Sequence, residues 1–90
     1  MNHLTVSAAL DVDANDVAPA LRKIESALLV SGATRPSTSF DERRGVVAVT
    51  FDLRVDKSED ARYRVESVMA GVANSTAFTV MGFAYYGFAA

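Results

Sequence analysis

Hydrophobic and polar residues alternate strictly along Val46–Asp56, which is the pattern of a β-strand with one buried and one solvent-facing side. The residues expected on the buried side are Val47, Val49, Phe51, Leu53 and Val55. Small or polar residues stand between them, and the β-branched and aromatic content of the stretch agrees with a strand. We therefore expect this strand to lie at the centre of a sheet that is covered on one face only.

The same alternation recurs along Leu4–Val12 and predicts a second half-buried strand. A helix is predicted next, because apolar residues recur at helical spacing along Val17–Leu28. Asn15 or Asp16 can serve as its N-cap, and Gly32 is suited to end it.

A short edge strand is expected at Ser37–Asp41, preceded by Pro36, which cannot donate a hydrogen bond to a ladder. The polar turn Asp41–Gly45 would join it to the central strand as a hairpin. A second helix is predicted after Ser58, a natural N-cap, and is expected to end at Asn74-Ser75. Its apolar stripe consists of Ala61, Val65, Val68, Met69 and Val72.

The last stretch, Thr76–Ala90, predicts a fourth strand that is apolar on both faces. One face would carry Phe78, Val80, Ala84, Tyr86 and Phe88, and the other Thr79, Met81, Phe83 and Tyr85. Contiguous exposed apolar side chains usually mark an interface, in which tyrosine is a frequent anchor. The residues that we expect at such an interface, most simply between two copies of the chain, are Met81, Phe83, Tyr85, Tyr86 and Phe88. The alternative is a tail that bends at Gly82 and Gly87 and folds back over its own domain.

The predicted elements follow the order strand, helix, strand, strand, helix, strand (βαββαβ). This order resembles the ferredoxin-like, or α/β plait, fold over nearly the whole chain. The resemblance implies an α+β domain in which a four-stranded antiparallel sheet has its first and third strands at the centre and both helices on one face. The chain has 90 residues, so we expect residues 1–90 to form a single domain.

Composition narrows the classes of function. The chain is 50% hydrophobic and 22% charged, which is typical of a globular protein, and its net charge of -2 argues against nucleic-acid binding through clustered basic residues. It has no cysteine, which removes disulfides, thiolate nucleophiles and most structural zinc sites. We expect no signal peptide and no membrane helix, and therefore a cytoplasmic protein. The preference for Ala, Val, Asp and Arg indicates a GC-rich genome, with a phage among the candidate sources.

Residues Arg44–Phe51 resemble the RNP1 motif of RNA-recognition domains in their Arg-Gly start, in Val49 and in the final phenylalanine. The base-stacking aromatics of that family would stand at Val46 and Ala48, and the aromatic of its companion motif at Thr5. Stacking on aromatic side chains supplies much of the energy of single-stranded RNA binding. Its loss here argues against a nucleic-acid partner.

The element order also resembles that of ACT-type regulatory domains, which bind small effectors near the first strand–helix loop at a dimer interface. The resemblance implies a candidate ligand loop that contains Asp11, Asp13, Asn15 and Asp16. The glycine usual in such loops is absent, and the plain alternative is an acidic turn with an N-cap. The loop also lacks the glycine and the distal glutamate of an EF-hand, so we expect no metal site.

We recognise no catalytic set, because His3 is the only histidine and no Ser-His-Asp arrangement, zinc signature or phosphate-binding glycine loop occurs. Arg43 and Arg44, with Arg35 nearby in sequence, could form an anion-binding corner or a solvated turn beside Asp41. We therefore expect a non-enzymatic interaction or regulatory module without a cofactor, homodimeric through its last strand. The alternatives are a small-molecule effector-binding domain and a small phage protein that binds and inhibits one host protein.

Overall fold

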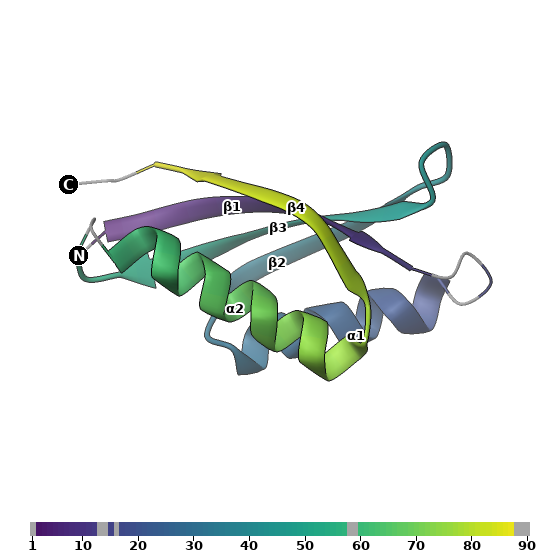
Figure 1. Ribbon diagram of the computed structural model, residues 1–90, viewed down its shortest axis with the longest axis horizontal. Coiled ribbons are helices and arrows are strands. Elements are labelled where there is room, and N and C mark those ends of the chain that lie inside the picture. Colours follow the sequence, from purple (N-terminus) through teal and green to yellow (C-terminus); the bar gives the residue numbers. More distant parts are fainter. Residues whose placement is uncertain (1, 13–14, 16, 58–59, 88–90) are drawn as a thin grey trace.

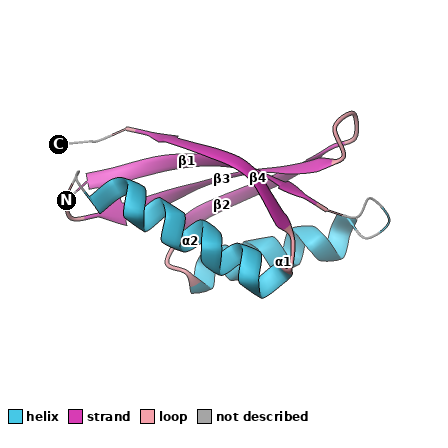
Figure 2. Ribbon diagram, viewed as in Figure 1, coloured by secondary structure: helices cyan, strands magenta, loops and turns pink. Residues whose placement is uncertain are grey.

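The computed structural model describes residues 2–12, 15, 17–57 and 60–87. Its elements are β1 (Asn2–Asp11), α1 (Val17–Val30), β2 (Thr34–Asp41), β3 (Val46–Val55), α2 (Ala61–Thr76) and β4 (Thr79–Tyr86). The four strands form one antiparallel sheet in the order β2-β3-β1-β4. Both helices cover the same face of this sheet, and the other face is open (Figures 1 and 2). The fold is therefore ferredoxin-like, with β1 and β3 at the centre as the order of elements predicts.

The core lies between the sheet and the two helices, and the alternation in β1 and β3 decides which side chains enter it. β1 and β3 pair without a register shift, so that Val6 stands opposite Phe51 and both are buried. The fully buried large side chains are Phe51, Leu4, Leu10, Ile24, Leu28, Leu53, Val6, Val47, Val49, Val65, Val68 and Val72. Burial of each contributes about 1.5–3 kcal/mol by transfer from water. The predicted buried faces of both central strands are confirmed.

α1 ends at the glycine that the sequence indicated. Gly32 has a φ of 95°, and its N–H donates to the carbonyl of Leu29 at 3.2 Å. The N–H of Ala33 donates to the carbonyl of Leu28 at 3.0 Å, which completes a Schellman motif. The predicted N-cap Asp16 lies outside the described residues.

α2 begins and ends later than predicted. Asp60 occupies the N-cap position, whereas Ser58 lies outside the described residues. At the other end the helix includes Thr76, which the sequence pattern assigned to the last strand. The Thr76 hydroxyl is buried, donates to the carbonyl of Val72 at 2.7 Å and accepts from the N–H of Phe78 at 3.2 Å. These bonds hold Thr76 in the helix and delay the start of β4.

Replacing Ala77 by glycine is expected to stabilise the protein. Ala77 follows α2 with a φ of 63°, and its N–H donates to the carbonyl of Ala73 at 2.9 Å. A side chain is disfavoured in this left-handed conformation, which glycine adopts freely. The free energy of unfolding should rise by about 0.5–1 kcal/mol, measured by chemical denaturation. Ala70→Gly, on the exposed face of the same helix, is the matched control and should lower it.

β2 is longer than predicted, because it begins at Thr34 instead of Ser37. The three added residues are irregular. The pairing with β3 shifts between Thr34 and Ser37, and Arg35 has a φ of 51°. Pro36 stands in the same segment, where an edge strand tolerates it. The predicted edge position of β2 is confirmed.

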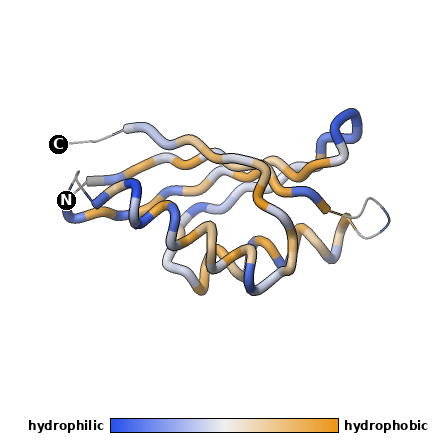
Figure 3. The backbone as a smooth tube through the Cα atoms, in the orientation of Figure 1, coloured by the Kyte–Doolittle hydropathy of each residue, from blue (hydrophilic) through white to orange (hydrophobic). Residues whose placement is uncertain are grey.

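The β2–β3 hairpin turn is held by one carboxylate. Asp41 accepts hydrogen bonds from the N–H groups of Arg43 at 3.0 Å and Arg44 at 3.3 Å, and Gly45 completes the turn with a φ of 66°. Figure 3 shows this turn as a strongly hydrophilic projection. Within the described residues, neither helix is long and apolar enough to cross a membrane.

Candidate interaction surface on the C-terminal strand

β4 forms one edge of the sheet and pairs with β1 only, among the strands that the structure describes (Figure 1). Its eight residues, TVMGFAYY, include no charged residue and no proline. A strand edge of this kind presents unpaired N–H and C=O groups to any other strand that approaches it. The outer side of β4 is therefore open to strand pairing.

The opposite edge of the sheet is protected. β2 contains Pro36, which lacks an N–H donor, and Arg35, whose positive φ interrupts the regular extended backbone. Proline, charge and irregularity are the devices by which natural sheets prevent edge-to-edge pairing. The two edges of this sheet thus differ, because β4 has neither proline nor charge and its pairing with β1 is regular from Gly82 to Tyr86.

A β-bulge in β4 changes which of its side chains face the helices. Val80 pairs with Leu10 and Gly82 pairs with Ala9, so Met81 is an extra residue between two consecutive residues of β1. An extra residue inverts the alternation of the strand beyond it. The period-two pattern of the sequence carries no sign of this insertion.

The inversion corrects the sequence-based assignment of faces. Phe83 and Tyr85 stand opposite buried residues of β1 and therefore lie on the helix side of the sheet, not on the open side. Ala84 and Tyr86 stand opposite the outward-facing residues of β1 and lie on the open face, where the pattern placed Phe83 and Tyr85. Val80 keeps its predicted helix-facing side, since it precedes the bulge.

The predicted interface residues differ in exposure. Met81 is 61% exposed, Tyr86 65% and Phe83 38%, which is unusual for large apolar side chains so close together in one strand. Tyr85 is half-buried and packs against the core. Phe88 lies outside the described residues. An exposed apolar surface therefore persists on β4 after folding, and Met81, Phe83 and Tyr86 form it.

An apolar groove runs between α2 and β4 on the helix side of the sheet. Its volume is about 310 Å³. The residues that line it are Glu66, Met69, Ala70, Ala73, Val80, Gly82 and Phe83. α2 contributes two small side chains, Ala70 and Ala73, to this groove, and Phe83 stays exposed beside them. Phe83 belongs both to this groove and to the exposed apolar side chains of β4.

The rim of this groove carries an ion pair on α2. Arg62 Nε donates to Glu66 Oε1 at 2.9 Å, across one helical turn. The hydrogen bond and the charge of Glu66, with a smaller contribution from Tyr85, raise the pKa of Arg62 above its ordinary value. Surface pairs of this geometry contribute little to stability. The pair marks the polar boundary of an otherwise apolar surface.

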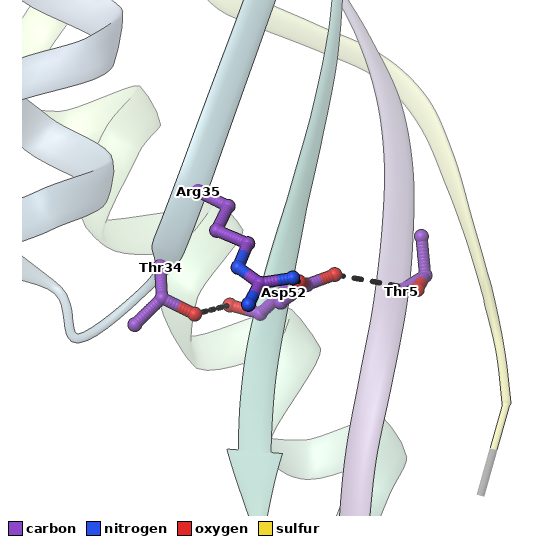
Figure 4. A network of polar contacts seen from close by, with 4 residues as sticks. All are labelled: Thr5, Thr34, Arg35 and Asp52. Carbon is purple, nitrogen blue, oxygen red and sulfur yellow. Dashed lines mark hydrogen bonds and ion pairs between the residues drawn. The ribbon is translucent and has the colours of Figure 1, made fainter.

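The open face of the sheet carries a polar network centred on Asp52 in β3 (Figure 4). The hydroxyl of Thr5 in β1 donates to Asp52 Oδ1 at 3.3 Å, and Arg35 Nη1 in β2 lies 4.0 Å from Asp52 Oδ2. The Thr34 hydroxyl donates to the main-chain carbonyl of Asp52 at 3.3 Å. This carboxylate links three strands, and the sequence pattern alone did not indicate it because only the strand register brings these residues together.

Two residues of the candidate ligand loop, Asp11 and Asn15, are among those that the structure describes. Asp11 and Asn15 are exposed, and neither lines the groove between α2 and β4. Asp13 and Asp16 lie outside the described residues. Among the residues whose placement is described, no group of three or more metal-ligating side chains occurs.

The arginines of the hairpin do not form an anion-binding corner with Arg35. Arg43 and Arg44 follow the last residue of β2, whereas Arg35 stands at its beginning. A strand of this length separates them by roughly 20 Å. Arg44 Nε lies 3.9 Å from Asp41 Oδ2, and each arginine is exposed. The interpretation as a solvated turn fits this arrangement.

The positions of the RNP aromatics lie on the open face, as the resemblance implies. Thr5 and Ala48 face outward there, and Val46 is half-buried at the end of β3. Small side chains thus occupy the places where stacking platforms would stand.

The geometry defines an α+β domain of ferredoxin-like topology with one apolar, uncharged edge. No protein-family model matches the sequence, and no curated protein shows significant similarity to it. Similar solved structures do exist, and their likeness extends over nearly the whole chain.

The de novo designed protein Foldit4 is 16% identical to this chain, with a TM-score of 0.56 over 93% of this chain and 96% of its own. A candidate antibiotic biosynthesis monooxygenase from Chloroflexus aurantiacus J-10-fl is 13% identical, with a TM-score of 0.55 over 98% of this chain and 94% of its own. One of these proteins was designed and the other comes from a bacterium, so the likeness concerns the fold and not a shared activity.

Proposed function

We propose that this chain is a non-enzymatic, cytoplasmic interaction module that forms a homodimer through β4. The observation that carries the proposal is the uncharged, proline-free edge of β4, along which Met81, Phe83 and Tyr86 expose apolar surface. A monomeric protein seldom keeps such side chains exposed together unless they bind something. Aromatic side chains at the centre of an interface contribute more than their share of its energy.

The expected affinity of the dimer depends on the free energy gained by burying apolar side chains and on the free energy that association costs. Complete burial of a fully exposed large apolar side chain contributes about 1.5–3 kcal/mol. Met81, Phe83 and Tyr86 are already partly buried, so each contributes a fraction of this, twice in a symmetric dimer. Association costs roughly 4–15 kcal/mol of translational and rotational freedom. Gain and cost are thus of similar size. We therefore expect a dimer of moderate affinity that forms in a concentration-dependent way.

The placement of the polar residues supports a role without catalysis. His3 is exposed on β1, and the side-chain oxygens of Asp52 contact Thr5 and Arg35. General acid–base catalysis needs a titratable group within reach of a substrate held in a pocket. Neither His3 nor Asp52 lines the groove between α2 and β4.

The double variant Met81→Ser/Tyr86→Ser is expected to be a folded monomer at concentrations where the wild-type protein is a dimer. Both side chains are exposed, so their loss should not disturb the core. The mass is measured by native mass spectrometry and by sedimentation velocity over a concentration series. Circular dichroism verifies that the variant is folded.

The matched control is Val30→Ser/Tyr63→Ser. It removes one aliphatic and one aromatic side chain that are 89% and 75% exposed on the helices, away from the edge of β4. The control should dimerise like the wild type. A wild-type protein that stays monomeric at high micromolar concentration, or a β4 variant that dimerises unchanged, would overturn the proposal.

A further inference from the structure

We infer that the two copies associate by main-chain pairing of their β4 edges, antiparallel about a twofold axis, to give one continuous eight-stranded sheet. This inference rests on the proposed homodimer and specifies how its interface is built. The competing arrangement packs the open faces of the two sheets against each other. Edge pairing uses the outward N–H groups of β4 as hydrogen-bond donors to the second copy, whereas face packing does not.

The orientation of these groups follows from a hydrogen bond at the far side of the sheet. The Thr34 hydroxyl in β2 reaches the main-chain carbonyl of Asp52, so the main-chain groups of Asp52 are directed towards β2 (Figure 4). Successive residues of a strand direct these groups to alternate sides, so those of Phe51 face β1. Phe51 pairs with Val6, whose main-chain groups therefore face β3.

The same alternation determines which main-chain groups of β4 face β1. Ser7 follows Val6 and directs its main-chain groups towards β4, where its partner is Ala84. Ala84 thus uses its N–H and C=O groups in the pairing with β1. Phe83 and Tyr85 flank Ala84, so their N–H and C=O groups are directed outward, to the free edge of the sheet. Two residues of the exposed aromatic segment therefore offer donors and acceptors to an incoming strand.

A second copy of β4 fits this edge better than a different partner, because the segment Thr79–Tyr86 carries no charge. A twofold axis places a strand opposite itself, and any charged residue near the axis would then face its own like charge. The absence of charge removes this penalty. The edge formed by β2 is excluded from the same reaction by Pro36 and Arg35.

The side chains on the helix side agree with edge pairing. Neighbouring strands place side chains of the same face next to each other. In the paired sheet, Phe83 and Tyr85 of one copy would lie beside those of the other, and both lie on the side of the apolar groove between α2 and β4. Edge pairing thus buries the exposed surface of Phe83. Packing of the open faces would instead bury the Asp52 network, in which Arg35 is 87% exposed in its side chain.

The test compares Phe83→Pro with Phe83→Ala. Both variants lack the aromatic ring, but only proline also removes the outward N–H group. If the edges pair, proline removes a hydrogen bond in each copy, and the dimer dissociation constant should be at least about tenfold higher for Phe83→Pro than for Phe83→Ala. Sedimentation velocity measures both constants. Equal constants for the two variants would overturn the inference.

Ala84→Pro is the positional control. It removes an N–H group that pairs with β1, so it should lower the melting temperature of the fold, whereas Phe83→Pro should leave it near that of Phe83→Ala. A reversed order of these two effects would show that the assigned orientation of β4 is wrong.

Amide hydrogen exchange of the wild-type protein tests the inference without a substitution. The N–H groups of Phe83 and Tyr85 should become protected as the protein concentration rises through the dimerisation range, while that of Ala84 is protected throughout. A wild-type dimer in which the amides of Phe83 and Tyr85 exchange freely would overturn edge pairing and leave the dimer itself standing. A wild-type monomer at all concentrations would overturn both.

Discussion

Replacement of Phe51 by alanine is expected to lower the free energy of unfolding by about 3–5 kcal/mol. Phe51 is 1% exposed and stands at the middle of β3, one of the two central strands. It is the largest of the fully buried side chains, so its truncation leaves the largest cavity that one such substitution can open in this core. A domain of this size has a total stability of about 5–15 kcal/mol, so this one truncation should remove at least about a fifth of it.

Urea denaturation followed by circular dichroism measures this loss. Val30→Ala is the control, because Val30 is 89% exposed and its truncation should change the stability by less than about 0.5 kcal/mol. A loss below about 1 kcal/mol for Phe51→Ala would contradict the burial of this side chain between sheet and helices, since full burial of a large apolar group contributes more than that.

Replacement of Gly32 by valine is expected to destabilise the protein by about 1–3 kcal/mol. Gly32 has a φ of 95°, which a β-branched residue adopts only under strain. A Cβ atom at this position would also lie 3.3 Å from Arg64 Nη2 on α2. Both effects act on the turn that connects α1 to β2.

The matched control is Gly82→Val in β4. The φ of Gly82 is not positive, and no atom outside Gly82 and its two chain neighbours lies within 4 Å of the Cβ that a valine would add. Valine also suits a strand. Thermal denaturation of the two variants should therefore show a lower melting temperature for Gly32→Val than for Gly82→Val. Equal melting temperatures would mean that the Schellman turn tolerates a side chain.

The central strands and both helices could be predicted from the sequence, because their patterns are local. The alternation in Val46–Val55 and the helical spacing in Val17–Leu28 depend only on the period of each element. Any fold that covers one face of such a strand must bury the same residues. The apolar stripe of α2 was recognised for the same reason, and its predicted members are buried.

The ends of α2 and the faces of β4 could not be predicted in this way. Thr76 belongs to the helix because its hydroxyl bonds to the carbonyl of Val72 and to the N–H of Phe78, a choice that the residue type alone does not dictate. The bulge at Met81 depends on the pairing of β4 with β1, a strand that lies some seventy residues earlier in the chain. An alternating sequence pattern does not indicate where a bulge inserts an extra residue.

The candidate interaction surface on β4 could likewise be predicted only in part from the sequence. The sequence alone shows many aromatic residues near the C-terminus, more than a strand with one buried face requires. The exposure of Met81, Phe83 and Tyr86, the partial burial of Tyr85 and the outward N–H groups of Phe83 and Tyr85 all follow from long-range strand pairing. Periodicity determines which residues can be buried together, whereas register determines which neighbour each residue meets, and only the folded chain contains the register.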